Sequence, residues 1–173
     1  MKEVFILNGS GGVGKDTFVS LVGILAVPVT HLSSITPAKE LAKQIGWSGD
    51  KTEKDRKFLS DLKDLMTEYN DYPFQYLKKQ VDFFLHDQDH YQVCFIDIRE
   101  PKEIEKAEKV FNATTVLVTA EGRVDPISTN HADAGVYDYQ YDFYVDNSGT
   151  IDDLKDAVVG FCTQFGIPIK EGV

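Results

Sequence analysis

The sequence predicts an α/β fold, a three-layer α/β/α sandwich in which helices cover both faces of a parallel sheet of about five strands. Short apolar runs alternate with amphipathic segments along the chain, and the first run, Val4 to Leu7, ends in a glycine-rich turn. A length of 173 residues, 42% of them hydrophobic and 27% charged, supports one hydrophobic core. We therefore expect a single domain over residues 1–173.

Each expected strand is a short buried run, and each is followed by helical spacing. Strands are expected at residues 4–7, 27–32, 91–98, 115–118 and 143–145. Helices are expected at 15–25, 37–46, within 51–86, at 102–111 and at 150–165. Pro37 and Pro101 stand where helices accept proline, and Tyr72-Pro73 divides the block 51–86 into two helices. Thr150 and Asp153 form a capping-box pattern at the start of the last helix.

The net charge, the cysteines and the N-terminal segment limit the partners and the location that the sequence predicts. Lys and Arg total 18 against 28 for Asp and Glu, so the surface repels a nucleic-acid polymer unless a basic face is concentrated. The two cysteines, Cys94 and Cys162, lack the spacing of a disulfide framework or a zinc site. The N-terminal apolar run is too short for a signal peptide or a membrane span. We expect a cytoplasmic protein, either monomer or homodimer, without a membrane partner.

The strongest functional signal is a glycine-rich segment between the first strand and the first helix. It reads Gly9-Ser10-Gly11-Gly12-Val13-Gly14-Lys15-Asp16-Thr17 and fits the pattern G-x-x-x-x-G-K. Glycines let successive backbone N–H groups converge on a phosphate, the helix N-terminus adds positive potential, and the lysine reaches the outer phosphates. The segment therefore predicts a P-loop that binds ATP, with Lys15 as its first catalytic residue.

The same glycines also satisfy G-x-G-x-x-G, the dinucleotide-binding pattern, as Gly9, Gly11 and Gly14. That fold requires an acidic residue about 20 positions on, at the end of the second strand. Residues 30–34 read Thr-His-Leu-Ser-Ser and contain none. The lysine position favours the P-loop over both a dinucleotide fold and a purely structural turn.

Three oxygen-bearing side chains are candidates for a Mg²⁺ site. Asp16 stands where a P-loop usually has Ser or Thr, and Thr17 follows it. Asp97 ends an apolar strand, where ligands bind in open α/β sheets, and a carboxylate there can hold magnesium through water. Helix capping by Asp16 or Thr17 and a strand-end cap by Asp97 are the structural alternatives.

The Gly-Lys-Asp-Thr form resembles the phage-type deoxynucleoside monophosphate kinases and the animal-type phosphomevalonate kinases, branches of the nucleoside monophosphate kinase superfamily. Short segments similar to that group follow in order along nearly the whole chain. They are Thr36-Pro37-Ala38-Lys39, Lys54-Asp55-Arg56, Asp97-Ile98-Arg99 and Asp146-Asn147. The resemblance implies an acceptor-binding helical region over residues 36–88 and a lid over 121–138.

The resemblance also implies roles for individual side chains. Lys39, Arg56 and Arg99 become candidates for binding a phosphorylated acceptor, since arginine grips phosphate as a fork. Lys15, Arg99 and, in the lid, Arg123 would supply the catalytic charge on the transferring group. Asn147 lies where the adenine pocket is expected. Solvated helix faces, a surface ion pair of Arg99 with a neighbouring glutamate, and a plain turn at Asn147 are the alternatives.

Together these features predict an ATP- and Mg²⁺-dependent phosphotransferase acting on a small phosphorylated acceptor, a nucleoside or deoxynucleoside monophosphate. Another acceptor of the phosphomevalonate or dephospho-coenzyme A type is the first alternative. The second is a non-catalytic nucleotide-binding protein, because residues 120–142 contain a single Arg and no Lys. The four histidines show no ligand spacing, so no role is expected for them.

Overall fold

A five-stranded parallel sheet forms the centre of the protein in the computed structural model, which describes residues 2–87, 92–122 and 135–171. The strands are β1 (Glu3–Asn8), β2 (Val29–Ser33), β3 (Val93–Asp97), β4 (Thr114–Thr119) and β5 (Phe143–Asp146). They lie in the order β2-β3-β1-β4-β5, and every neighbouring pair is parallel. The predicted fold class is confirmed.

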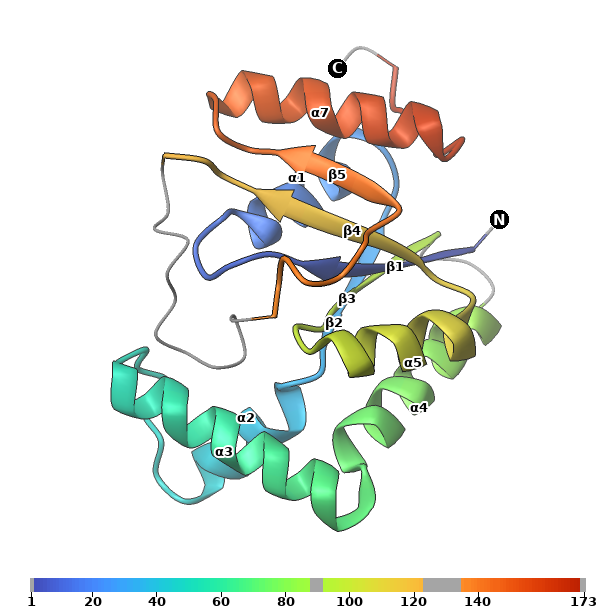
Figure 1. Ribbon diagram of the computed structural model, residues 1–173. Helices are drawn as coiled ribbons and strands as arrows, with labels where there is room; N and C mark the ends of the chain where they lie inside the picture. The colour runs from blue at the N-terminus through green and yellow to red at the C-terminus, as the bar shows by residue number, and fades with distance from the viewer. Residues whose placement is uncertain (1, 88–91, 123–134, 172–173) are drawn as a thin grey trace.

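Helices cover both faces of the sheet (Figure 1). They are α1 (Lys15–Leu25), α2 (Thr36–Gln44), α3 (Glu53–Asn70), α4 (Tyr72–His86), α5 (Pro101–Phe111) and α7 (Ile151–Gln164). Helices α1 and α7 pack on one face and α4 and α5 on the other. The expected break between α3 and α4 falls at Asp71, which has a left-handed backbone with φ of 58° just before Pro73.

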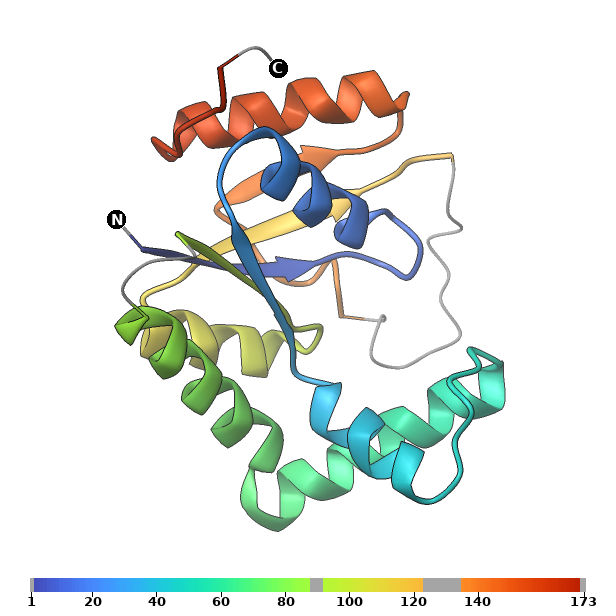
Figure 2. The same cartoon turned by 180° about the vertical axis from the view of Figure 1, so that it is seen from behind.

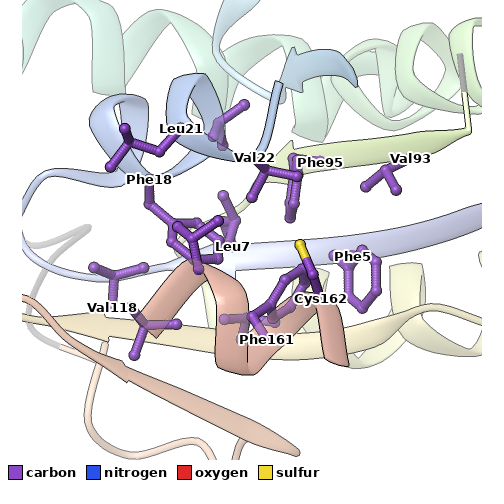
Figure 3. Packing of buried hydrophobic residues seen from close by; sticks show 14 of the residues in the cluster. Phe5, Leu7, Phe18, Leu21, Val22, Val93, Phe95, Val118, Phe161 and Cys162 are labelled. Atoms are coloured by element: carbon purple, nitrogen blue, oxygen red, sulfur yellow. The ribbon is translucent and has the colours of Figure 1, made fainter. Parts of the chain in front are cut away.

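The side chains of β1 alternate between two cores, as the pleat of a strand requires. Phe5 and Leu7 point toward α1 and α7, where rings such as Phe18, Phe95 and Phe161 pack edge to face (Figure 3). Val4 and Ile6 point the other way, toward α4 and α5. Because both faces of this strand are buried, its position is fixed, and the loop that follows it starts from a rigid base.

Helices α2 and α3 form an arm that lies apart from the sheet at its lower edge in both views (Figure 2). Helix α3 begins with a capping box, in which Thr52 and Asp55 each accept a hydrogen bond from the other's backbone N–H. The same device begins α7 at Thr150 and Asp153, as predicted. Helices α3 and α7 therefore both have well-defined first turns.

Two expectations differ from the structure or fall outside it. Strand β2 begins at Val29 and not at Val27, because Pro28 has no N–H to donate to the ladder. Of the expected lid, residues 123–134 lie outside the described residues, so the lid remains a prediction. Among the described helices, none combines the length and the apolar character that a bilayer crossing requires.

Candidate active site

The carboxyl ends of β1, β2 and β3 meet at one edge of the sheet. Leu7 and Ser33 both pair in register with Asp97, so the glycine-rich loop after β1 starts beside the ends of its two neighbours. In open parallel sheets this edge is where ligands bind, at the point where strand order reverses. Here that point lies between β1 and β3, whose following helices α1 and α5 cover opposite faces.

The loop keeps a conformation that requires glycine at two positions. Gly9 has φ of 144°, and a Cβ there would stand 2.4 Å from the Val118 carbonyl oxygen. Gly14 has φ of 91°, and a Cβ there would stand 2.4 Å from Asn147 Nδ2. That amide donates to the Val13 carbonyl at 2.8 Å and fastens the loop to the segment before α7.

Asn8, at the end of β1, connects the loop to two other segments. Its Oδ1 accepts from the Gly9 N–H at 2.8 Å, while its Nδ2 donates to the Arg99 carbonyl at 3.1 Å and to the Tyr141 hydroxyl at 2.7 Å. The Tyr141 hydroxyl donates in turn to the Val136 carbonyl. A fully buried amide therefore fixes the start of the loop relative to the backbone of Arg99.

Lys15 begins α1, and its ammonium group donates to the Gly9 carbonyl at 2.6 Å and the Ser10 carbonyl at 3.3 Å. The side chain therefore lies back across the loop that precedes it. A phosphate on the loop would meet both the loop N–H groups and this ammonium. The predicted contact of Lys15 with the outer phosphates of ATP stays a prediction.

Two hollows flank the loop. One of about 330 Å³ is lined by Gly12, Gly14, Thr17, Ala120, Asn147, Ile151 and Leu154. The other, of about 300 Å³, lies on the side of Ser10, Thr119, Glu121 and Tyr137. Asn147 and the apolar side chains of Ile151 and Leu154 line the first hollow, and the binding of an adenine base by Asn147 stays a prediction. Thr17 also lines the first hollow, and its role in metal binding stays a prediction.

A histidine and two aspartates meet at the sheet edge beside Lys15. His31 Nε2 lies 3.1 Å from Asp97 Oδ2, and His31 Nδ1 lies 4.0 Å from Asp16 Oδ1. Partial burial acts to lower the pKa of His31, but the hydrogen bond and charge of Asp97, together with Asp16, outweigh it and raise that pKa. The sequence gives His31 no ligand spacing, and its contact with Asp97 arises because strand pairing joins residues 66 positions apart.

Lys39 on α2 faces the same edge. Burial lowers the pKa of its ammonium group most, and the charges of Lys51 and Arg99 lower it further, while Asp97 and Asp16 act in the opposite direction. Cations held within electrostatic reach of one another create a positive potential that a bound anion would relieve. Lys51, which sequence reasoning missed, thus joins Lys39 and Arg99 in a basic cluster.

Arg56 lies at the margin of this cluster. Its Nε donates to the Lys51 carbonyl at 3.2 Å, and the side chain is exposed in the first turn of α3. Contact between Arg56 and an acceptor therefore remains a prediction. Arg123 lies outside the described residues, and its catalytic role also stays a prediction.

A buried lysine ties the arm to the segment that carries Arg99. Lys63 on α3 is 4% exposed and donates to Glu100 and Glu103 at 2.6 Å each. Burial acts to raise the pKa of Glu100, but Lys63 outweighs it and lowers that pKa, whereas burial and the Glu100 charge raise the pKa of Glu103 to about 7. Glu100 and Glu103, the glutamates next to Arg99 in the sequence, therefore bind Lys63.

This triad makes stability depend on pH. The folded protein holds a proton on Glu103 between the ordinary pKa of 4.5 and about 7, whereas the unfolded chain has lost it. Unfolding free energy should therefore fall as pH rises through that window. In Glu103→Gln this fall should be smaller, so the Tm of the variant minus the Tm of the wild type should increase from pH 5 to pH 8. Glu105→Gln, on the exposed face of α5, is the control, and equal slopes for the wild type and Glu103→Gln would contradict the assignment.

The sheet order and the glycine-rich loop after β1 are those of the P-loop kinase fold, which solved structures of similar fold share. No protein-family model matches the sequence, and no curated protein is significantly similar to it. The structure is similar to TT1252 from Thermus thermophilus, with a TM-score of 0.54 and 15% identity over 94% of this chain and 97% of that one. It is also similar to a dephospho-CoA kinase from Campylobacter jejuni, with a TM-score of 0.53 and 14% identity over the same shares. For a tunicamycin resistance protein from Deinococcus radiodurans the TM-score is 0.52 at 14% identity over 98% of both chains.

Proposed function

We propose that this protein transfers the γ-phosphoryl group of ATP to a small phosphorylated acceptor, of the nucleoside or deoxynucleoside monophosphate class. One observation carries the proposal. A P-loop with its lysine opens onto the same sheet edge as a cluster of three cations, Lys39, Lys51 and Arg99. A phosphorylated acceptor would be attracted by these cations, whose repulsion Asp97 and Asp16 offset in part.

The phosphates of ATP and of the acceptor would be bound by two separate sets of residues. The loop N–H groups and Lys15 would hold the phosphates of ATP, with the base in the hollow next to Asn147. The arm would present Lys39 and Lys51 to the acceptor, opposite Arg99 at the sheet edge. Phosphoryl transfer asks mainly for positioning and charge neutralisation, which these groups supply.

The carboxylates at the sheet edge fit a magnesium ion. Asp97 Oδ1 is buried and has no hydrogen-bond partner within the described part of the chain, and Asp16 is exposed beside it. Oxygen donors of this kind suit Mg²⁺. When bound with ATP, the ion would neutralise charge on the β- and γ-phosphates.

The proposal is tested by measuring ADP release with a panel of acceptors. Nucleoside and deoxynucleoside monophosphates form the first group, and phosphomevalonate and dephospho-coenzyme A form the second. We expect turnover to require a phosphorylated acceptor and to be fastest within the first group. Turnover confined to the second group would retain the kinase and overturn the acceptor class. The second group is included partly because a dephospho-CoA kinase has a similar fold.

Arg99→Lys should separate acceptor binding from ATP binding. An ammonium keeps the charge but loses the two-pronged grip of a guanidinium on phosphate. We expect KM for the acceptor to rise about tenfold or more, which is the cost of about one strong hydrogen bond, while the Kd of ATP stays unchanged. Lys102→Arg, an exposed position three residues further on, is the control. An equal loss of affinity for both substrates would rule out an acceptor clamp.

A further inference from the structure

One buried charge has no part in the proposed transfer. Among the described residues, Lys63 on α3 is the only charged residue that is buried, and its ammonium group donates to Glu100 and Glu103 at 2.6 Å each. Stability alone is a weak reason to keep such a triad, because well-packed apolar side chains of similar volume often stabilise a fold as well or better. A buried ionic network can instead be retained because it holds its members in fixed positions.

The triad lies beside Arg99 in the chain. Glu100 follows Arg99 directly and is the N-cap residue of α5, and Glu103 stands in the first turn of that helix. On the side of the sheet, the Arg99 carbonyl accepts a hydrogen bond from Asn8 Nδ2 at 3.1 Å. The segment that carries Arg99 is therefore held at two points, by Asn8 at the end of β1 and by Lys63 from the arm.

We propose that Lys63 is a positioning residue for acceptor binding, because it binds two carboxylates that would otherwise pair with the Arg99 guanidinium. An ion pair with either glutamate would occupy the same N–H groups that grip a phosphate. The inference rests on the proposed function, in which Arg99 binds the phosphate of a nucleoside or deoxynucleoside monophosphate. Lys63 is 4% exposed, so it acts through the two glutamates and not by touching a substrate.

The charge of the triad supports this role. One ammonium group and two ionised carboxylates would leave a net negative charge next to Arg99. Burial raises the pKa of Glu103 most and the charge of Glu100 raises it further, so that together they outweigh Lys63 and bring this pKa to about 7. Below that pH Glu103 holds a proton and the triad is neutral. A neutral triad preserves the positive potential that attracts an anionic acceptor.

The test compares two ways of breaking the triad. Lys63→Met leaves two carboxylates without their cation, whereas the double variant Glu100→Gln with Glu103→Gln leaves the ammonium group without its anions. Both should lower stability, because each leaves buried charge unpaired. Only Lys63→Met releases carboxylates that are able to pair with Arg99. A merely structural link between α3 and α5 would be damaged by both.

Acceptor KM is measured by ADP release with the nucleoside or deoxynucleoside monophosphate that turns over fastest in the panel. Lys63→Met should raise this KM at least about tenfold, the cost of about one charge-assisted hydrogen bond, while the Kd of ATP stays unchanged. The double variant should keep it at or below about twice the wild-type value, since removing negative charge does not weaken attraction for a phosphate. A crystal structure of Lys63→Met without substrates should show Arg99 paired with Glu100 or Glu103, a result that needs no turnover.

Lys57→Met is the matched control. Lys57 pairs with Asp61 at 2.5 Å on the exposed surface of the same helix, so its loss should leave the acceptor KM unchanged. If Lys63→Met does not fold, Lys63→Met combined with Glu103→Gln leaves a single carboxylate to bury and should show the same rise in KM.

Equal rises of the acceptor KM in Lys63→Met and in the double variant would overturn the positioning role and leave phosphoryl transfer to stand. Wild-type KM in the folded Lys63→Met variants would do the same. Pairing of Arg99 with a glutamate in Lys63→Met, in a protein that turns over no phosphorylated acceptor, would instead support the effect of Lys63 on Arg99 and overturn the proposed function alone.

Discussion

Lys15→Ala is expected to reduce kcat for phosphoryl transfer at least about a hundredfold, a loss of about 3 kcal/mol in transition-state stabilisation. The lysine is the one side chain of the loop that would carry positive charge to the outer phosphates of ATP. Its ammonium group donates to two loop carbonyls and lies outside both hydrophobic cores, so the fold should remain. Steady-state kinetics and circular dichroism check the two halves of this expectation.

Lys170→Ala provides a matched control for this substitution. Lys170 also donates to two backbone carbonyls, those of Gly23 and Ile24, but at the other end of α1. Loss of a carbonyl-binding lysine there should leave kcat within about twofold of the wild type, as expected for a surface change. Comparable kcat losses in the two variants would assign Lys15 to helix stability and would remove it from catalysis.

Gly9→Ala is expected to lower the free energy of unfolding by about 2 to 5 kcal/mol. A positive φ costs an alanine about 1 to 3 kcal/mol, and overpacking adds about as much. The new Cβ would stand 2.4 Å from the Val118 carbonyl oxygen and 2.9 Å from Val13 Cγ2, so either β4 or the loop must move. Denaturant unfolding measures the loss, and ATP titration should show weaker binding because the loop shifts.

Gly49→Ala separates the strain of the dihedral angle from the overlap. Gly49 has φ of 98°, and an added Cβ there would meet nothing within 4 Å. This variant should cost about 1 kcal/mol and leave ATP affinity unchanged. If both variants lose the same free energy of unfolding, then the close approach of Gly9 to β4 does not contribute to the stability of the fold.

Much of the scaffold could be predicted from local patterns. Helix α1 begins and ends where the sequence predicts, because the glycine turn and the apolar spacing both act within a few residues. The capping box at Thr150 and the break before Pro73 are local signals of the same kind. Strand β1 was recognisable because burial on both faces leaves a continuous apolar run.

The site was only partly predictable, because its geometry depends on strand order. His31 has no ligand motif in the sequence and gains its partners only because β2 lies beside β3. Lys51 looks like an ordinary charged residue in the sequence, and only the fold brings it within electrostatic reach of Lys39. Lys63 stands at a helical position that reads as exposed, and only tertiary packing buries it against two glutamates.

Phosphorus NMR of a complete reaction mixture tests the central claim most directly, because it follows the γ-phosphoryl group itself. With ATP, Mg²⁺ and the best acceptor of the panel, the γ-phosphate signal should decay while signals of ADP and of a newly phosphorylated acceptor grow in equal amounts. Lys15→Ala should show neither change over the same period. Decay of the γ-phosphate signal into inorganic phosphate, or an unchanged spectrum with every phosphorylated acceptor in a protein that binds ATP, would contradict phosphoryl transfer to a small phosphorylated acceptor.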